Sequence, residues 1–454
     1  MAHSSGTSVA VVGAGPAGMA TAFRLAQAGA AVTVYEATAR VGGRARTDLV
    51  DGWRVDPACQ LFGSVYTTFL RVLRAAGGGS LCVRTPGRDA LWRRGKAHEV
   101  VYGSPASMLA SGALPFGLKL RLAVYPPYLH RHAAALEPAA LERAAAEGLD
   151  RESIAAWGVR EPGRDFVDLL AAPTLAALYG TLPEEASAGF YHAVARQGMH
   201  AEVLALAGGA SAFCDALAAA LSRLGGRVLT GRRVRAVHPA KGGVELSGEG
   251  WTERFGAVVL AVPAPAAREI DGMTRPVVEW LEGVRVRPTV SLALLLDRPA
   301  GVRWFALSFA RGESRALAAA CVQENKLGDR VPPGRGLVVA YPLPEAGERL
   351  AAANADADTV LRALLPDLSR ALPGIESAIR RVVLYHWPHA WTVFSPGYLA
   401  RLGELRRTGL DFDGRIALAG DYLYMPNLEG AALSGVRAAE RVCAALGLPT
   451  LPGD

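Results

Sequence analysis

The chain contains little cysteine, little lysine and no long apolar run, and each shortage excludes a class of protein. The five cysteines are scattered, odd in number and without metal-ligand spacing, so we expect a reduced protein with no structural disulfide and no metal. No apolar run of about eighteen residues is free of charges and helix breakers, which argues against a membrane-spanning helix. The polar start, Met1–Thr7, lacks a signal-peptide core, and we expect a cytoplasmic protein.

Basic charge is plentiful, but almost none of it is lysine. Only four of the 49 basic residues are lysines, and the arginines are spread along the chain rather than gathered beside aromatic residues. A nucleic-acid partner requires a continuous basic surface, so we expect none. With 454 residues, of which 51% are hydrophobic, the chain is long enough for a large buried interior divided between two domains.

The most informative segment lies in the first fifty residues. Val9–Val12 predicts a buried strand, Gly13–Gly18 follows as a glycine-rich turn, and Met19–Ala28 predicts an alanine-rich helix. A second apolar run then leads to Glu36. This order of strand, turn, helix, strand and acid predicts a dinucleotide-binding unit.

Each part of this unit has a physical task. Gly13 permits the tight turn, Gly15 lets a pyrophosphate approach the backbone, and Gly18 allows close packing of helix and strand. The helix N-terminus offers unpaired N–H groups to the phosphates, and Glu36 can accept hydrogen bonds from an adenosine ribose. The predicted nucleotide-binding residues here are Gly13, Gly15, Pro16, Ala17, Gly18, Glu36 and Ala37.

Two further patterns add glycine and charge. Residues 40–47 read Arg-Val-Gly-Gly-Arg-Ala-Arg-Thr, which permits a second close backbone approach and supplies guanidinium groups for phosphate oxygens. Far away in the sequence, residues 416–421 predict a buried strand that ends in Gly-Asp, and residues 427–435 open a last helix with Glu-Gly-Ala. The first pattern is typical of a phosphate site, whereas a strand, Gly-Asp and a helix in this order are common in α/β proteins.

Together these motifs resemble the FAD-binding superfamily of amine oxidases, protoporphyrinogen oxidases and phytoene desaturases. The resemblance implies FAD as cofactor, with the Gly-Asp pair at its pyrophosphate and ribityl chain and the last helix at the pyrimidine edge of the flavin. Reduction places negative charge at that edge, where a helix N-terminus stabilises it. The cofactor-binding residues implied in this way are Arg40, Gly43, Arg44, Val234, Gly420, Asp421, Leu428, Gly430 and Ala431.

The resemblance also implies an α/β fold, in which a Rossmann-like FAD-binding domain is interleaved with a substrate domain of mixed β-sheet plus helices. The FAD-binding domain would comprise residues 1–75, 205–270 and 410–454. The substrate domain would comprise residues 76–204 and 271–409, with a helical subdomain over 100–204.

Within these domains the residue patterns predict several individual elements. Helices are predicted over 138–148 and over 166–179, and Pro173 should kink or break the second. A further helix should begin near Asp356 or Asp358, either of whose carboxylates could cap it, and Pro366 should bend or end it. Strands are predicted over 290–296, 336–342 and 380–387.

The catalytic residues are predicted from the resemblance as well. Residues 56–62 occupy the place of a loop that passes along the flavin, with Ala58 where the superfamily has glycine. We therefore place Ala58, Cys59 and Gln60 at the cofactor; Gln60 either bonds the ring or the substrate, or is a solvated loop residue. Trp391 and Tyr398 resemble an aromatic stretch on the substrate side, with core packing as the alternative. The predicted catalytic residues are Gln60, Trp391 and Tyr398.

These features predict an FAD-dependent oxidoreductase that removes hydride from carbon of a largely apolar small-molecule substrate, in a desaturation-type reaction. The alternative is amine or amino-acid oxidation, although residues 288–292 lack the lysine that amine oxidases commonly place near the flavin. A remote alternative is a non-redox binding protein that resembles the GDP-dissociation inhibitors, against which the intact flavin motifs argue. No pattern specifies the electron acceptor or the oligomeric state.

Residues 105–132 carry an additional alternative. Their apolar residues are flanked by Lys119, Arg121 and Arg131, and protoporphyrinogen oxidases attach to membranes through such a helical segment. Peripheral membrane contact is one prediction for this segment, and packing in the core of the substrate domain is the other.

Overall fold

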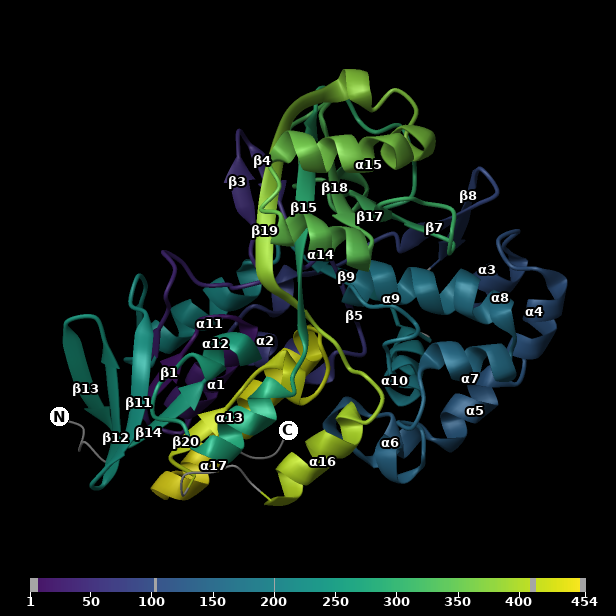
Figure 1. Cartoon of the computed structure of the whole chain (residues 1–454). Coiled ribbons are helices and arrows are strands. Elements are labelled where there is room, and N and C mark those ends of the chain that lie inside the picture. Colours follow the sequence, from purple (N-terminus) through teal and green to yellow (C-terminus); the bar gives the residue numbers. More distant parts are fainter. Residues whose placement is uncertain (1–6, 102–103, 200, 409–413, 450–454) are drawn as a thin grey trace.

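The computed structural model describes residues 7–101, 104–199, 201–408 and 414–449. The predicted segments 1–75, 76–204 and 410–454, and the polar start Met1–Thr7, therefore lie partly outside the described residues. Figure 1 shows a parallel sheet with its helices at one end of the molecule, a large mixed sheet above it, and a group of helices to one side. The predicted fold class, α/β with a mixed sheet plus helices, is confirmed.

A five-stranded parallel sheet is assembled from three distant parts of the chain. Its strands, in spatial order, are β10 (Arg227–Leu229), β2 (Ala31–Tyr35), β1 (Ser8–Val12), β14 (Ala257–Leu260) and β20 (Ile416–Leu418). The apolar run of β1 is buried because the sheet is covered on both faces. Since the chain leaves β1 toward β2 on one side and returns at β14 on the other, the carboxyl end of β1 is a switch point, where ligands bind.

Helices from both ends of the chain pack together on this sheet. They are α1 (Pro16–Gln27), α2 (Thr67–Ala75), α11 (Ala212–Arg223) and α17 (Leu428–Leu446). Small residues bring α1 and α17 close: a Cβ at Gly435 would lie 2.3 Å from the Ala17 carbonyl oxygen, and the Thr21 hydroxyl donates to the Gly435 carbonyl at 3.1 Å. This contact holds the last helix beside the first.

The described residues also form three smaller sheets. An antiparallel sheet consists of β11 (Val234–Ala240), β12 (Gly243–Gly248) and β13 (Trp251–Phe255). A second consists of β5 (Phe62–Gly63), β9 (Val203–Leu206) and β6 (Cys82–Arg84), and a two-stranded one of β3 (Asp48–Val50) and β4 (Trp53–Val55).

A seven-stranded mixed sheet forms the other large layer. In spatial order its strands are β19 (Ile379–Thr392), β15 (Val286–Leu296), β18 (Gly336–Pro342), β17 (Leu317–Val322), β16 (Ala306–Phe309), β7 (Arg88–Arg93) and β8 (Lys96–Val101). The predicted strand over 336–342 has these bounds, whereas β15 and β19 are longer than predicted. They pair with each other and run down to the parallel sheet (Figure 1).

Two helices, α14 (Pro344–Ala352) and α15 (Ala357–Ala371), pack against this mixed sheet. Asp356 caps α15 as predicted, because its carboxylate accepts a hydrogen bond from the Thr359 backbone N–H at 2.8 Å. Pro366 does not end the helix. The buried apolar face of α15, which includes Leu364 and Leu368, packs on the sheet and outweighs the lost backbone hydrogen bond.

The remaining helices form the group beside the two large sheets. They are α3 (Pro105–Ala110), α4 (Phe116–Leu122), α5 (Tyr125–Arg131), α6 (Arg143–Ala146), α7 (Ile154–Arg160), α8 (Arg164–Phe166), α9 (Ala172–Tyr179), α10 (Ala188–Gly198), α12 (Ala264–Arg268), α13 (Arg275–Glu282) and α16 (Tyr398–Thr408). None of the described helices is long and apolar enough to cross a membrane.

One helix prediction in this group needs correction, whereas the interruption expected near Pro173 is present. Residues 138–148 form a 3₁₀ turn (Pro138–Ala140) and the one-turn helix α6 rather than one continuous helix. Leu141 and Ala144 are fully buried, so packing rather than alanine propensity sets the local course. Between α8 and α9 the chain forms a π-turn, and Pro173 then lies in the first turn of α9, where its missing N–H removes no helix bond.

Candidate active site

The glycine turn after β1 combines tight packing with an open face. Gly13 has φ +102°, and a Cβ there would lie 2.5 Å from the Ala261 carbonyl oxygen. A Cβ at Gly18 would lie 1.9 Å from the Gly13 carbonyl oxygen. At Gly15 no atom lies within 4 Å of the Cβ position, and no side chain caps the N-terminus of α1. The turn therefore leaves a free helix N-terminus for an anion.

Glu36 stands at the end of β2 beside this turn. One carboxylate oxygen accepts a hydrogen bond from the Ala14 backbone N–H at 2.9 Å, and the other accepts from the Thr38 N–H at 2.8 Å. The Arg232 backbone N–H donates to the Glu36 carbonyl at 2.9 Å, which brings the start of β11, and with it Val234, to the same place. Ala37 is exposed next to Glu36.

The second glycine pair lies directly against the first turn. The Gly42 N–H donates to the Ala14 carbonyl at 2.9 Å, and a Cβ at Gly43 would lie 3.4 Å from the Gly15 Cα. Arg44 follows, and its guanidinium donates to the Ala390 carbonyl at 2.9 Å and to the Asp421 carboxylate at 3.0 Å. Segments from both ends of the chain thus meet at one point.

Arg40 does not share this position. Its guanidinium pairs with Asp48, and it lines a separate cavity of about 260 Å³ together with Thr47, Gly208 and Ser211. The structure therefore places Arg40, one of the predicted cofactor-binding residues, outside the main cavity.

The start of α17 completes the site. Asn427 caps the helix, since its side-chain oxygen accepts from the Gly430 N–H at 2.9 Å, and a Cβ at Gly430 would lie 2.0 Å from the Met425 carbonyl oxygen. Glu429 points elsewhere. Its buried carboxylate accepts hydrogen bonds from the Thr68 and Phe69 N–H groups at 3.0 and 2.9 Å and so caps α2.

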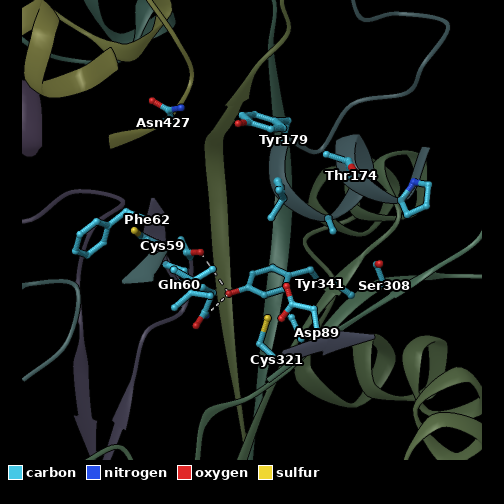
Figure 2. Close-up of a pocket in the computed structure, with 18 of the residues that line it drawn as sticks. Cys59, Gln60, Phe62, Asp89, Thr174, Tyr179, Ser308, Cys321, Tyr341 and Asn427 are labelled. Carbon is cyan, nitrogen blue, oxygen red and sulfur yellow. Dashed lines mark hydrogen bonds between the residues drawn. The ribbon is translucent and has the colours of Figure 1, made fainter. Parts of the chain in front are cut away.

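A single cavity of about 430 Å³ extends from these motifs toward the mixed sheet and the helices (Figure 2). Of the predicted cofactor-binding residues, the ones that line it are Pro16, Arg44, Ala58, Cys59, Gln60, Asp421, Leu428 and Ala431. Apolar side chains line much of the remainder: Leu91, Leu114, Leu169, Leu170, Pro173, Leu178 and Leu307. The cavity therefore joins a nucleotide-binding region to an apolar chamber.

Gln60 is held by a hydrogen-bond network at the cavity wall. Its amide nitrogen donates to the Tyr341 hydroxyl and to the Asp56 carbonyl, both at 2.5 Å. Its amide oxygen accepts from the Gln323 side chain at 2.8 Å and from the Lys326 ammonium at 3.2 Å. This arrangement shows that Gln60 is not a freely solvated loop residue.

Behind Gln60 lies a buried cluster of charges. The Asp56 carboxylate is 2.7 Å from the Lys326 ammonium and 3.5 Å from the Arg330 guanidinium, and all three side chains are 1% exposed or less. Burial alone would raise the pKa of Asp56, but the two cations hold that pKa below its ordinary value. The cluster fixes the loop that carries Ala58 and Cys59.

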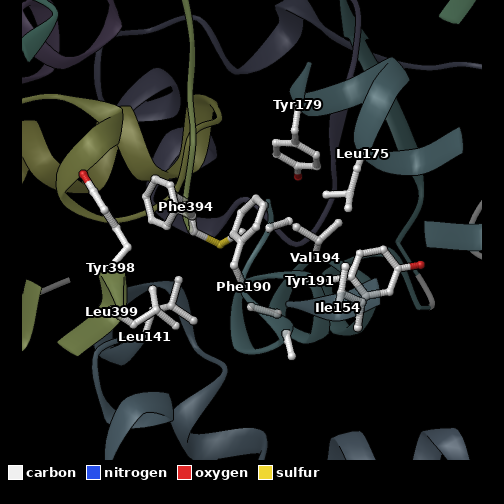
Figure 3. Close-up of a cluster of buried hydrophobic side chains, with 14 of the residues drawn as sticks. Leu141, Ile154, Leu175, Tyr179, Phe190, Tyr191, Val194, Phe394, Tyr398 and Leu399 are labelled. Atoms are coloured by element: carbon white, nitrogen blue, oxygen red, sulfur yellow. The ribbon is translucent and has the colours of Figure 1, made fainter. Parts of the chain in front are cut away.

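The two predicted catalytic aromatics have different surroundings. Trp391 lines the cavity, and its ring lies against Gly180, where a Cβ would be 2.2 Å away. Tyr398 is not among the lining residues. Its hydroxyl donates to the Tyr422 carbonyl at 2.8 Å, and its ring packs against Phe394 in the buried cluster of Figure 3. Core packing, the alternative reading, describes the surroundings of Tyr398.

Several lining residues were missed because no local motif marks them. Asp89, Tyr179, Cys321, Tyr341 and Trp387 come from five separate elements that only the fold brings together. Lys326 was missed because a lysine was sought on residues 288–292, whereas a short 3₁₀ turn after β17 places this one beside Gln60.

Comparison with known proteins places the chain in a family. The sequence profile of flavin-containing amine oxidoreductases matches residues 16–443, and the chain belongs to this family. The predicted superfamily is thereby confirmed. A hydroxysqualene dehydroxylase of Rhodopseudomonas palustris is 31% identical over 290 residues, which are 59% of this chain and 65% of that protein.

Two further similarities agree with this assignment. A mitochondrial protoporphyrinogen oxidase of Nicotiana tabacum is 27% identical over 41% of this chain and 35% of its own length. These matches span less than two thirds of either relative. The structure of cyclohexylamine oxidase from Brevibacterium oxydans superimposes with a TM-score of 0.73 over 97% of this chain and 99% of that chain, at 20% identity, and so shares the fold.

The site fits the cofactor of this family. The uncapped N-terminus of α1, the open space at Gly15 and the guanidinium of Arg44 suit a pyrophosphate, and the apolar chamber follows directly. These residues would hold FAD in a chain that belongs to the flavin-containing amine oxidoreductases.

Proposed function

We propose that this enzyme oxidises carbon in a largely apolar small molecule, by a desaturation-type removal of hydride. The observation that carries the proposal is the continuity of the cavity, which runs from Arg44 and Asp421 to a chamber walled by side chains such as Leu170 and Leu307. An apolar wall favours an apolar substrate and excludes water from the reacting carbon.

The role proposed for the chain's own residues is to hold the substrate. When bound, FAD would accept the hydride from one carbon, and the proton lost from the neighbouring carbon as the double bond forms would be released to solvent. Trp391 presents a rigid aromatic surface, while Gln60, held by Tyr341 and Lys326, keeps the loop beside the cofactor in place. Orientation of the reacting carbon is the contribution such residues make to the rate.

The names of two relatives support this substrate class, because hydroxysqualene dehydroxylase and protoporphyrinogen oxidase are named for substrates other than amines. The test is reduction of the bound flavin by candidate substrates without oxygen, which is monitored as loss of the flavin's visible absorbance. We expect the compounds that bleach the flavin to be found in a panel of largely apolar molecules, isoprenoid, carotenoid and porphyrinogen compounds among them, whereas simple amines and amino acids should leave the flavin oxidised. Bleaching by simple amines or amino acids alone would contradict the proposal and favour amine oxidation.

We also propose that the substrate enters from a membrane surface to which the helices α3 to α5 attach peripherally. Phe116, Leu120 and Val124 are 75%, 60% and 71% exposed, while Leu118 and Leu129 pack inward. The segment therefore has both buried and exposed apolar residues, and membrane contact through the exposed ones is our proposal. An exposed apolar surface of this kind beside basic residues favours an anionic lipid surface.

The place where the cavity wall reaches the protein surface, near α3, also supports entry of the substrate from this side. Met108 of α3 and Leu178 of α9 both line the cavity and are exposed, at 37% and 46%. Flotation with vesicles that contain phosphatidylserine tests the proposal. Phe116→Ser combined with Leu120→Ser should abolish flotation, whereas the control Leu224→Ser, an exposed leucine on the distant α11 side, should not. Wild-type protein that stays entirely in the soluble fraction would overturn it.

A further inference from the structure

One ionisable side chain in the apolar chamber has no role in the function proposed above. Asp89 lies on β7, and the surface it exposes faces the cavity. Its neighbours on the wall are apolar or weakly polar, among them Leu91, Leu307 and Ser308. A carboxylate in such surroundings is costly unless it has a partner.

The described part of the chain offers Asp89 no cation. No Lys, Arg or His among residues 7–101, 104–199, 201–408 and 414–449 forms an ion pair with Asp89. Arg44, which lines the cavity, pairs with Asp421, and Lys326, which contacts Gln60 behind the wall, pairs with Asp56. A hydrogen bond from the Ala306 backbone N–H offsets part of the effect of burial on the Asp89 carboxyl.

Figure 2 shows Asp89 beside Cys321, near the backbone end of the Tyr341 ring, whereas Gln60 lies at the hydroxyl end of that ring. The Tyr341 hydroxyl contacts Gln60, as described above, and lies 3.4 Å from the Ala58 carbonyl. Asp89 is thus on the chamber side of Tyr341, and the flavin loop is on the other. A group bound at Asp89 would be held apart from the reacting carbon.

We propose that Asp89 binds a protonated amine of the substrate and fixes the molecule by that end, while an apolar carbon chain extends toward the flavin. The substrate class is therefore an apolar molecule that carries one basic nitrogen remote from the carbon that is oxidised. This inference rests on the proposed function and narrows its substrate. An ammonium group of the ligand would form the ion pair that no described side chain of the protein forms with Asp89.

The charge state of Asp89 agrees with this role. Burial raises its pKa to about 7. The other titratable groups that face it are Cys321 on β17, whose pKa burial raises to about 12, and Tyr341 on β18, whose pKa burial also raises. On β8 the residue paired with Asp89 is Val100, and His98 lies on the same face two residues away.

The test measures binding of octylamine and of its neutral counterpart 1-octanol to the FAD-loaded enzyme by calorimetry. At pH 8 we expect wild-type enzyme to bind octylamine at least about tenfold more tightly than 1-octanol. Asp89→Asn, which has nearly the same shape, should bind both alike. Glu99→Gln is the matched control, because Glu99 lies on the opposite face of the same hairpin, where it pairs with Arg88 and Arg303.

A second measurement needs no variant. The preference of wild-type enzyme for octylamine should decline between pH 8 and pH 5 as Asp89 becomes protonated, and subtraction of the Asp89→Asn profile removes any contribution of His98. Equal binding of octylamine and 1-octanol by wild-type enzyme at pH 8 would overturn the inference. So would bleaching of the flavin by octylamine in both wild-type and Asp89→Asn enzyme, since the amine would then lie at the flavin. Failure of every apolar compound to reduce the flavin would instead overturn the proposed function alone.

Discussion

The guanidinium of Arg44 lies 3.0 Å from the carboxylate of Asp421, although 377 positions separate them in the sequence. This ion pair joins the second glycine pair to the end of β20, at the mouth of the nucleotide-binding turn. Asp421 is 9% exposed, so loss of Arg44 would leave a nearly buried carboxylate without this partner. The pair ties both ends of the chain to the cofactor site.

Replacement of Arg44 should therefore weaken cofactor binding. We expect Arg44→Met to raise the Kd for FAD by about 10- to 100-fold, because a charge-assisted hydrogen-bond donor is lost and Asp421 is left unpaired. Titration of the apoprotein with FAD, followed by quenching of flavin fluorescence, measures this change. Arg380→Met, which breaks an exposed pair with Asp297, is the control and should leave the Kd unchanged. Equal affinities of Arg44→Met and wild type would contradict the assignment.

Alanine substitutions at two glycines of the turn should have different effects, one on the stability of the fold and the other on FAD binding. Gly18→Ala should destabilise the fold by about 3 kcal/mol or more, because its methyl group would overlap the Gly13 carbonyl. Gly15→Ala should leave the Tm of the apoprotein nearly unchanged, since its methyl group enters open space, yet it should weaken FAD binding there. Thermal unfolding with and without FAD separates the two effects. A large loss of apoprotein stability in Gly15→Ala would show that this space belongs to the fold.

The buried cluster behind Gln60 should make stability depend on acid. Lys326→Met should cost about 3–5 kcal/mol near neutral pH, because it removes a partner of a buried carboxylate. The pKa of Asp56 is lowered in the folded state, so this stabilisation is present above the unfolded-state pKa of about 4 and is lost as the pH falls through the folded value. Urea unfolding at several pH values measures the free energy of unfolding. The difference in this free energy between Lys326→Met and wild type should become smaller as the pH falls.

The control for that experiment is Lys241→Met, which removes an exposed lysine and should change stability by about 0.5 kcal/mol or less. A difference between Lys326→Met and wild type that stays constant down to the lowest pH at which both proteins fold would contradict the role of the ion pair.

The pH dependence of stability that Asp89 contributes should be opposite to that of Asp56. Its pKa is raised to about 7 in the folded state, so the folded protein holds a proton that the unfolded chain has released, and stability falls as the pH rises from about 4 to about 7. Asp89→Asn should therefore stabilise the enzyme by on the order of 2 kcal/mol at pH 8, and hardly at all at pH 4. Thermal unfolding at both pH values checks this. An equal gain in stability of Asp89→Asn at pH 8 and at pH 4 would indicate that the substitution acts through packing rather than through loss of the charge.

Features that depend on short stretches of the chain could be predicted from the sequence, whereas features that depend on long-range packing could not. The glycine turn, Glu36 and the Asp356 cap were recognisable because each rests on contacts between residues close in sequence. The Gly-Asp and Glu-Gly-Ala patterns were recognised by resemblance, and the structure places them at the same cavity as the turn. The interruption expected at Pro366 did not occur, because the packing of α15 on the mixed sheet is a long-range effect that outweighs a local one.

The sequence by itself determined that this protein binds a dinucleotide, because the glycine turn is a local arrangement of strand, glycine and helix. The flavin family followed from the resemblance of the Gly-Gly-Arg, Gly-Asp and Glu-Gly-Ala motifs. Only the tertiary structure decided what surrounds the cofactor. It put Tyr398 in the core, turned Arg40 toward Asp48, placed Lys326 behind Gln60, and brought Asp89 to the wall of the cavity. Those positions follow from the packing of separate sheets and helices, in which no residue's neighbours can be read from the residues beside it in the chain.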